Sequence, residues 1–311
     1  MAVLTLAIWA LAGCSGSPAS QAPSAAPTLD PATDQLGRIL SRGTLIAYYD
    51  VDYLPQSDVV DGAARATTTK CTADQLTANQ VEGYDNEVTK LVAEGLGVEA
   101  CFIRFPFAEV VAGNWGNQID IAYSSGSLNG DRMTRLYMTQ PYYASPNRYF
   151  VRDDTTYETA QDLSGEEIGT CSGCSHELYL KGELVIPGTD IVVEVDDPQL
   201  VSYEAEPAGL RDVAAGEIDA FLCGEAVGQQ LIDEGVPLRA LEKSAFEIYP
   251  SGFIDKSSGY DPVAFVSGVN DIVDGLHADG TLIALSLEWF KKDYATKAGA
   301  FDLAATGQVV P

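Results

Sequence analysis

Cys171 and Cys174 are separated by two residues, and His176 follows them closely. A dithiol at this spacing can act as a redox pair, because a helix N-terminus lowers the pKa of a thiol. It can also form a local disulfide that shapes a turn, or one of its thiols can bridge to Cys223. We favour the structural interpretation over the redox one. No second Cys-x-x-Cys and no pair of histidines accompanies the motif, so the sequence predicts no metal centre.

The two histidines, His176 and His277, add no catalytic arrangement. Neither lies beside a recognisable serine or cysteine nucleophile motif, and the chain has no phosphate-binding loop or metalloprotease motif. His176 follows the Cys-x-x-Cys turn and can line a cleft, whereas we expect His277 to face solvent. The sequence therefore predicts a protein that is not an enzyme and that carries no cofactor.

The charge balance excludes one class of partner. The 311 residues include 18 Lys and Arg against 45 Asp and Glu, a formal net charge of −27 that is spread along the whole chain. Such a surface repels phosphate backbones and anionic lipid headgroups. We therefore expect no nucleic-acid partner, and any membrane association must come from a dedicated anchor.

The first residues supply a candidate anchor. MAVLTLAIWALAGC is an apolar run too short for a comfortable spanning helix, and its end, Leu11-Ala12-Gly13-Cys14, resembles a bacterial lipobox. Residues 1–14 are thus expected to be a lipoprotein signal peptide, with acyl chains on Cys14 as the membrane anchor. An ordinary secretory leader with a chance cysteine remains the alternative. Either way the chain is exported, to the extracellular face of the membrane or to the periplasm.

A polar segment separates this leader from the folded part. Residues 15–35 are rich in Ser, Ala and Pro and show no periodic apolar face, which predicts a flexible tether.

From residue 36 onward, short β-rich runs alternate with amphipathic stretches, the pattern of βαβ units. Strands are expected at residues 44–49, 101–104, 119–123, 167–171, 191–195 and 219–223. Helices are expected at residues 86–94, 175–181, 208–215 and 226–234, and again from Asp261-Pro262 to Phe290. The pattern restarts near residue 167, so the sequence predicts an α/β protein of two lobes, each with a mainly parallel sheet flanked by helices.

In this order the chain resembles the family-three extracellular solute-binding proteins, the polar amino-acid-binding subunits of ABC importers. The resemblance runs from about Gly43 to Lys297. Four passages carry it: DVDYLP (50–55), EGYDNEVTKLVAEGLGV (82–98), DIAYSSGSLNGDR with TQPYY (120–132, 139–143) and LHADGTLIALSLEWF (276–290). It implies a bilobal, type II periplasmic-binding-protein-like fold with a two-strand hinge. Residues 36–144 and 252–311 would form the first lobe and residues 145–251 the second.

The resemblance also implies how a ligand is held. Arg132 matches the arginine that clamps an α-carboxylate, a task suited to a guanidinium with two parallel N–H donors. Ser125 and Ser127 match positions that contact the polar end of the ligand. In the second lobe, Gly173-Cys174-Ser175 occupies the place of a turn whose backbone N–H groups hold the other carboxylate oxygen.

Three further positions match those around the ligand side chain. Tyr53 and Phe107 would sandwich an apolar or planar cationic group. Asp50 matches an acidic position found in relatives specific for basic amino acids. It is also common in relatives that bind other ligands, so it favours a basic ligand without deciding the matter.

One position departs from the family pattern. Gly224 stands where the family has the aspartate that receives the α-ammonium group. We expect Glu225, the nearest acid, to take over this role. If Glu225 faces away, the ligand class shifts towards carboxylates without a free amine.

Among the six cysteines, the resemblance implies a disulfide between Cys71 and Cys101, and Cys171 with Cys174 is the other expected pair. The implied function is capture of a small polar ligand, an amino acid or related carboxylate, by a monomer that delivers it to ABC permease and ATPase subunits. Two alternatives remain: an enzyme like the cyclohexadienyl dehydratases, with Glu225 or His176 as general acid, and a ligand-sensing module of a receptor.

Overall fold

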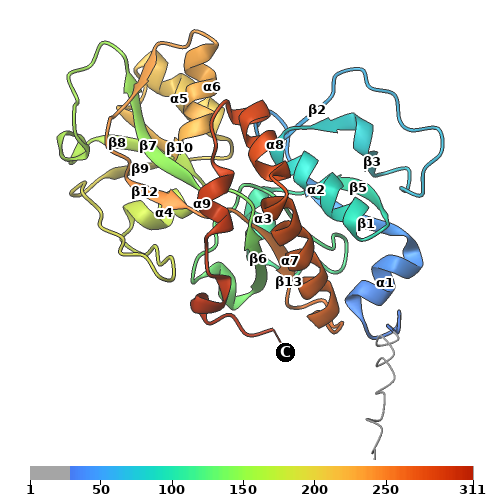
Figure 1. Ribbon diagram of the computed structural model, residues 1–311. Helices are drawn as coiled ribbons and strands as arrows, with labels where there is room; N and C mark the ends of the chain where they lie inside the picture. The colour runs from blue at the N-terminus through green and yellow to red at the C-terminus, as the bar shows by residue number, and fades with distance from the viewer. Residues whose placement is uncertain (1–28, 311) are drawn as a thin grey trace, which may run out of the picture.

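The computed structural model describes residues 29–310 (Figure 1). The predicted signal peptide, the lipidation site Cys14 and most of the predicted tether lie outside these residues. Inside them, the folded part begins earlier than residue 36, because Asp34 forms a β-bridge with Asp261 and the amide of Asp261 donates to the carbonyl of Thr33. None of the described helices has the length and apolar character needed to cross a membrane.

The first lobe is built on two small sheets that meet edge to edge. Its elements are α1 (Gln35–Arg42), β1 (Thr44–Tyr49), β2 (Asp58–Val59), β3 (Leu76–Thr77), β4 (Val81–Glu82), α2 (Tyr84–Gly95), β5 (Glu99–Arg104), α3 (Phe107–Ala112), β6 (Leu136–Pro141) and β13 (Ser251–Asp255). Besides a short β2–β4 pair, one sheet has the order β1-β5-β3, and β13 pairs with β6 in the other. Residues 121 and 122 join them through isolated bridges from Ala47 to Ile121 and from Ala122 to Phe253.

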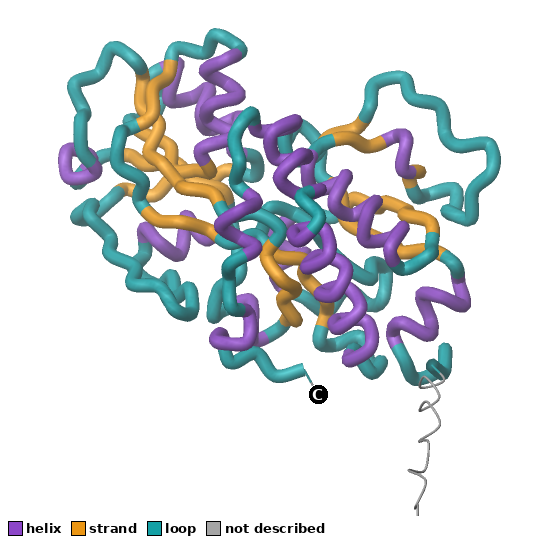
Figure 2. Tube along the Cα trace, viewed as in Figure 1, coloured by secondary structure: helices purple, strands orange, loops and turns teal. Residues whose placement is uncertain are grey.

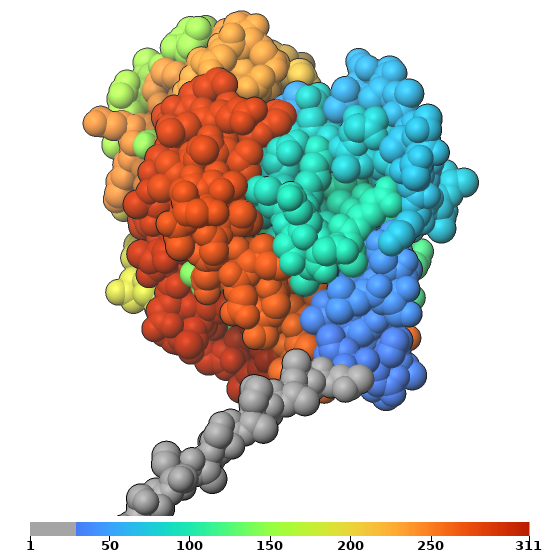
Figure 3. Space-filling model, turned by 45° about the vertical axis from the view of Figure 1, so that its right-hand side comes forward, coloured from blue at the N-terminus to red at the C-terminus, as the bar shows by residue number. Residues whose placement is uncertain are grey.

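The C-terminal helices return to this lobe. They are α7 (Val263–Ala278), α8 (Thr281–Phe290) and α9 (Ala295–Gly299). Phe265, Val269 and Phe290 bury their apolar faces against α2 and the β1–β5 pair in a single hydrophobic cluster. Figure 3 shows the C-terminal part, orange to red, packed side by side with the teal α2 region, and α2 indeed contacts both α7 and α8.

The second lobe is built on a larger sheet. Its elements are β7 (Ser145–Arg152), β8 (Glu167–Cys171), α4 (Ser175–Leu180), β9 (Gln199–Tyr203), α5 (Glu206–Ala215), β10 (Ala220–Gly224), α6 (Glu225–Asp233), β11 (Leu238–Ala240) and β12 (Phe246–Ile248). The strand order is β11-β7-β10-β8-β9, and β12 pairs with β7. Figure 2 shows these strands gathered on the left of the view, apart from those of the first lobe.

The chain passes between the two lobes twice, from β6 into β7 and from β12 into β13. β7 enters the second lobe while β12 leaves it, so the two run in opposite directions and pair antiparallel, with Phe246 opposite Asn147. Among the strands of residues 29–310, the parallel pairs are β1–β5, β8–β9 and β8–β10. The bilobal α/β fold is thus confirmed, with more antiparallel pairing than the sequence predicted.

Two predicted strands are wrong: residues 119–123 form only isolated bridges at Ile121 and Ala122, and residues 191–195 form no strand. The β-branched run 191–195 is a loop with Val192 66% exposed, and the strand beside β8 is β9, eight residues later. Asp197, at positive φ, and Pro198 separate this loop from β9. β9 is the run that precedes α5. High β-propensity did not decide the outcome, because the run that pairs with β8 is the one adjacent to the crossover helix.

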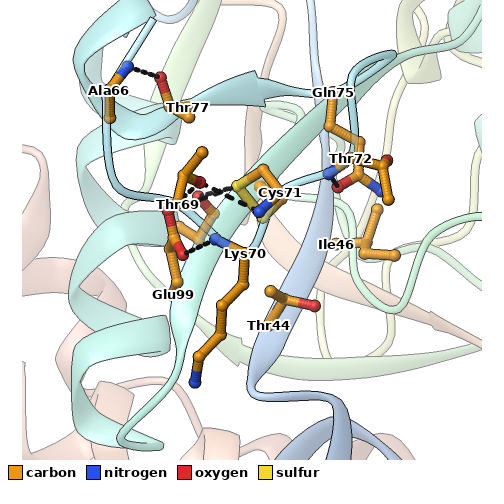
Figure 4. Close-up of a disulfide and its surroundings, with 12 residues drawn as sticks. Thr44, Ile46, Ala66, Thr69, Lys70, Cys71, Thr72, Gln75, Thr77 and Glu99 are labelled. Atoms are coloured by element: carbon orange, nitrogen blue, oxygen red, sulfur yellow. Dashed lines mark hydrogen bonds between the residues drawn. A yellow bond between two sulfur atoms is a disulfide. The ribbon is translucent and has the colours of Figure 1, made fainter.

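The predicted disulfide between Cys71 and Cys101 is present and joins the segment before β3 to β5. Figure 4 shows Thr69, Lys70 and Glu99 around Cys71. The Lys70 amide donates to the Glu99 carboxylate at 2.7 Å, and the Thr69 hydroxyl also donates to it. The disulfide and these bonds fix the long polar insertion to the sheet of the first lobe.

Candidate functional site

A cavity of about 620 Å³ lies between the two lobes. Both lobes contribute to its lining, from the carboxyl ends of β1, β8, β9 and β10, where α/β sheets present ligand-binding groups. The lining includes most of the residues that the sequence singled out: Asp50, Tyr53, Phe107, Ser125, Ser127, Arg132, Cys174, Ser175 and Gly224.

Arg132 is the buried cationic group of this cavity, whereas Arg104, which also lines it, is exposed. Its side chain is almost completely buried, with Nη1 donating to the Ser127 carbonyl at 2.8 Å and Nη2 donating to the Gly173 carbonyl at 3.0 Å. Within residues 29–310, no carboxylate lies within 4.0 Å of the guanidinium. Burial lowers the pKa of Arg132 to about 10, so the group stays charged at neutral pH. A buried, charged guanidinium without a counter-ion favours the binding of an anion.

The two predicted serines are already hydrogen-bonded within the protein. The Ser125 hydroxyl donates to Asp85 at 2.7 Å, and the Ser127 hydroxyl donates to the Leu128 carbonyl at 3.0 Å. Asp85 also accepts a bond from the Tyr142 hydroxyl at 2.6 Å. These serines therefore shape the backbone at the cavity wall, and Ser125 adopts a positive φ of 52° to do so.

The turn at residues 173–175 differs from the expected carboxylate cradle. The Gly173 amide donates to Glu177 at 2.9 Å, and the Cys174 amide donates weakly to the Cys171 carbonyl at 3.4 Å. The Ser175 hydroxyl accepts a bond from Asn129 of the first lobe at 3.2 Å. Two of the three backbone donors are thus occupied, and the turn instead bridges the lobes.

Glu225 does not line the cavity, which corrects the expectation that it replaces the family aspartate. Its carboxylate accepts bonds from Arg148, Lys292 and the Tyr294 hydroxyl, the last at 3.0 Å. Burial alone would raise the pKa of Glu225, but these three partners hold it below its usual value. Lys292 and Tyr294 follow α8 whereas Arg148 lies in β7, so Glu225 ties the two lobes together.

Glu206 is a buried acid of the cavity that the sequence analysis missed. It is the first residue of α5, directly after β9, and lines the cavity with only 3% of its surface exposed. Its Oε2 atom is buried without a hydrogen-bond partner. Burial raises the pKa of Glu206 to about 8. A strand predicted at residues 199–203 would have placed Glu206 just after its carboxyl end, where ligand-binding residues are expected.

Two further polar atoms of the lining lack partners: Oε1 of Gln56 and the hydroxyl of Ser124 are buried and make no hydrogen bond. Buried polar groups are normally hydrogen-bonded, so orphans gathered on one cavity indicate a polar ligand. On the aromatic side, the Arg132 guanidinium lies 5.4 Å from the centre of the Phe107 ring.

The second disulfide joins Cys171 to Cys174, and among the described residues this leaves Cys223 as a free, buried thiol. His176 lines the same cavity, and burial lowers its pKa to about 3. His277 is partly buried rather than solvent-facing, because Nε2 contacts the Pro141 carbonyl at 2.8 Å.

Comparison with known proteins matches residues 70–292 to the family model of bacterial extracellular solute-binding proteins, family 3. The chain is 25% identical over 260 residues to the L-cystine-binding protein TcyJ of Escherichia coli (strain K12), an alignment covering 83% of this chain and 86% of that protein.

Solved structures share the fold. The ancestral amino acid-binding protein AncCDT-1, a precursor of cyclohexadienyl dehydratase, aligns with a TM-score of 0.66 at 19% identity, over 83% of this chain and 99% of that one. The amino acid ABC transporter substrate-binding protein AbpA from Streptococcus pneumoniae, bound to L-arginine, aligns with a TM-score of 0.64 at 24% identity, over 85% and 99%.

Proposed function

Because the chain belongs to family 3 of the bacterial extracellular solute-binding proteins, we propose that it is the substrate-binding subunit of an ABC importer and captures an amino acid in the cavity between its lobes. The observation that carries this proposal is a buried cation and a buried acid that face one cavity and both lack a partner. Arg132 of the first lobe lacks an anionic partner, and Glu206 of the second lobe has an unpartnered carboxyl oxygen. A zwitterionic α-amino acid supplies both missing partners at once.

In this proposal Arg132 binds the α-carboxylate, and its contacts with the Ser127 and Gly173 carbonyls fix the direction of the guanidinium. Glu206 takes the role of the aspartate that the family has at the position of Gly224, and it accepts the α-ammonium group. Ammonium binding favours the ionised form of Glu206, so the two charges stabilise each other away from water.

The ligand side chain then extends towards Asp50, Tyr53 and Phe107. Asp50 already accepts a bond from the Tyr48 hydroxyl at 2.7 Å, and its carboxylate lines the cavity. An acid next to two aromatic rings fits a cationic or polar side chain better than a purely aliphatic one. The relatives named for cystine and arginine are compatible with this class of ligand.

We further propose that residues 36–144 with 252–311, and residues 145–251, move as two lobes about the β6–β7 and β12–β13 crossings. Contacts from both lobes to one ligand favour the closed form. The protein acts as a monomer on the outer side of the membrane, anchored through Cys14, and its ligand passes to permease and ATPase subunits. The ABC transporter role of the relatives supports import over sensing.

The dehydratase-like alternative loses both of its proposed acids. Glu225 is held in ion pairs outside the cavity, and burial lowers the pKa of His176 to about 3 while its Nε2 is bound to Asn147 at 2.6 Å. We therefore propose that the cavity binds without turnover. Incubation with prephenate or arogenate should leave these compounds unchanged.

A thermal-shift screen of the purified protein against the amino acids tests the proposal, since a ligand that binds only the folded form raises the melting temperature. We expect one or a few amino acids to raise it, and the Arg132→Ala variant to lose the response. Arg135→Ala is the matched control, because Arg135 is exposed and pairs with Asp131 on the surface. If no amino acid stabilises the protein, or if Arg132→Ala responds like the control, the proposal is wrong.

A further inference from the structure

Four potential metal ligands converge on the second-lobe side of the cavity. They are Cys171, Cys174, His176 and Glu206, and one donor atom from each lies within 4.8 Å of all the others. Cys171 ends β8, Cys174 lies in the turn that follows, His176 lies in the first turn of α4, and Glu206 begins α5. Sequence spacing could not reveal this group, because Glu206 is 30 residues beyond His176 and its approach depends on the β8–β9 pairing.

The distances between these atoms match the edges of a tetrahedral metal site. The Cys171 sulfur lies 3.3 Å from Oε1 of Glu206 and 3.6 Å from Nδ1 of His176, and Nδ1 lies 3.6 Å from the same Oε1. Tetrahedral Zn²⁺ with its usual bond lengths to sulfur, nitrogen and oxygen separates such ligands by about 3.4–3.6 Å. The donor atoms of Cys171, His176 and Glu206 therefore already stand within about 0.3 Å of the separations that one shared cation requires.

The imidazole of His176 is oriented for this role. Nε2 lies 2.6 Å from Oδ1 of Asn147, while Nδ2 of Asn147 donates to the Phe246 carbonyl at 3.4 Å. Since Oδ1 can only accept, Nε2 carries the proton and Nδ1 presents its lone pair to Cys171 and Glu206. A hydrogen bond on the far ring nitrogen is the usual support of a metal-binding histidine.

The cluster also lacks a positive centre. The lone pair of Nδ1 faces a carboxyl oxygen, and Oε2 of the same Glu206, which is 3% exposed, has no partner. Arg132, the buried cation of the cavity wall, bonds instead to two carbonyls. A cation bound between Nδ1 and the carboxylate would satisfy both groups.

We propose that, once the Cys171–Cys174 disulfide is reduced, Cys171, Cys174, His176 and Glu206 form a tetrahedral binding site for a thiophilic divalent cation of the Zn²⁺ type. Two thiolates and an imidazole select such a cation over Mg²⁺ or Ca²⁺, which prefer oxygen ligands. In the oxidised form the sulfurs are bonded to each other and the site is closed to metal. The pair thus gates metal binding by its redox state.

The chemistry balances with a phosphine as reductant. The phosphine attacks one sulfur and breaks the S–S bond, and water then converts it to the phosphine oxide while both sulfurs become thiols. Binding of Zn²⁺ to the two thiols releases their two protons, so metal affinity rises with pH.

Metal and amino acid are expected to exclude each other, a consequence that rests on the proposed function. Both occupants use Glu206, and a cation bound there cancels the charge that attracts the ammonium group. Reduction in the presence of Zn²⁺ would therefore lower the affinity for the amino acid. The metal site itself is tested without any amino acid, so the two proposals can fail separately.

The test measures Zn²⁺ uptake by the purified protein, before and after phosphine reduction under anaerobic conditions, in competition with a chromophoric chelator. We expect about one equivalent of tightly bound Zn²⁺ only after reduction. With Co²⁺, the reduced protein should show thiolate charge-transfer absorption and the intense visible bands of tetrahedral coordination. Equal uptake before and after reduction, or an octahedral Co²⁺ spectrum, would overturn the proposal.

Matched variants locate the site. Cys171→Ser with Cys174→Ser should abolish uptake, whereas Cys71→Ser with Cys101→Ser should keep it, because that pair lies in the first lobe. Asn147→Ala should weaken Zn²⁺ binding about 10- to 100-fold through the loss of the imidazole support. If the double variant does not fold, the nearly isosteric Glu206→Gln tests the site in its place, and it should also weaken Zn²⁺ binding. Unchanged affinity in both Asn147→Ala and Glu206→Gln would contradict the assignment.

Discussion

Replacement of Glu206 by glutamine should change which ligands the protein accepts. In our account Glu206 is the only partner of the α-ammonium group, since Gly224 has no side chain and Glu225 is bound by Arg148, Lys292 and Tyr294. Glutamine keeps the size and one carbonyl oxygen of the side chain but removes its ability to carry a negative charge.

The size of the effect follows from the burial of this charge. Glu206 is 3% exposed and has an unpartnered oxygen, so the ammonium would be paired away from water. Removing one partner of a buried, hydrogen-bonded charge pair costs about 2–5 kcal/mol, which corresponds to roughly 30-fold to several thousand-fold in affinity. The analogue of the same ligand without its amine should bind the wild type weakly and lose little further affinity in Glu206→Gln.

Isothermal titration calorimetry of the wild type and the variant with both ligands measures this difference. Glu217→Gln is the matched control, because Glu217 is an exposed acid in the same lobe and should leave both affinities unchanged. If Glu206→Gln binds the amino acid as tightly as the wild type does, the ammonium lies elsewhere and the reasoning from the unpartnered oxygen is refuted.

Three further predictions concern stability. Burial raises the pKa of Asp85 from 3.8 to about 7, so between these pH values the folded protein keeps a proton that the unfolded chain has lost. The free energy of unfolding should therefore fall by an amount on the order of 4 kcal/mol as the pH rises through this range. Denaturation curves measured at several pH values should show this fall in the wild type and not in Asp85→Asn. Gly83→Ala places a Cβ 2.3 Å from the Gln56 carbonyl oxygen at a φ of 107°, and should lower the free energy of unfolding by about 2–5 kcal/mol in urea titrations. The control Gly97→Ala, where no atom lies within 4 Å of the new Cβ, should lower it by about 1 kcal/mol. Loss of the Cys71–Cys101 disulfide, which spans 30 residues, should cost about 4 kcal/mol by the same measurement; an unchanged denaturation midpoint would show that the insertion is held by its hydrogen bonds alone.

The sequence predicted those elements whose apolar pattern and flanking residues agree. The predicted strands at 44–49 and 167–171 coincide with β1 and β8, and the predicted helix at 226–234 is shifted by one residue from α6. Gly43, which closes α1 in the left-handed conformation, marks the boundary before β1 clearly. In these places local propensity and tertiary packing favour the same structure.

The errors share a physical origin in long-range pairing. The run 191–195 has the stronger β-propensity, yet β9 forms beside β8 because it is attached to the crossover helix. The run 119–123 contributes only bridges at residues 121 and 122, since it fills the gap between β1 and β13. Neither outcome can be derived from the segment itself.

The site shows the same division. Residues matched through their motifs, such as Arg132 and Tyr53, line the cavity, and their role in ligand binding remains a prediction. Glu225 was chosen because it is next to Gly224 in sequence. As the first residue of α6, however, it points its side chain towards Lys292 and Tyr294 and not into the cavity. Glu206 reaches the cavity because β9, which precedes it, pairs with β8. Placing that strand at residues 191–195 hid this position from the sequence prediction.

A crystal structure of the protein with its bound amino acid tests the central claim most directly. We expect the ligand carboxylate in a hydrogen-bonded ion pair with the Arg132 guanidinium and the ammonium group at about 3 Å from Glu206. A ligand bound in the cavity with its ammonium away from Glu206, or with its carboxylate away from Arg132, would contradict it.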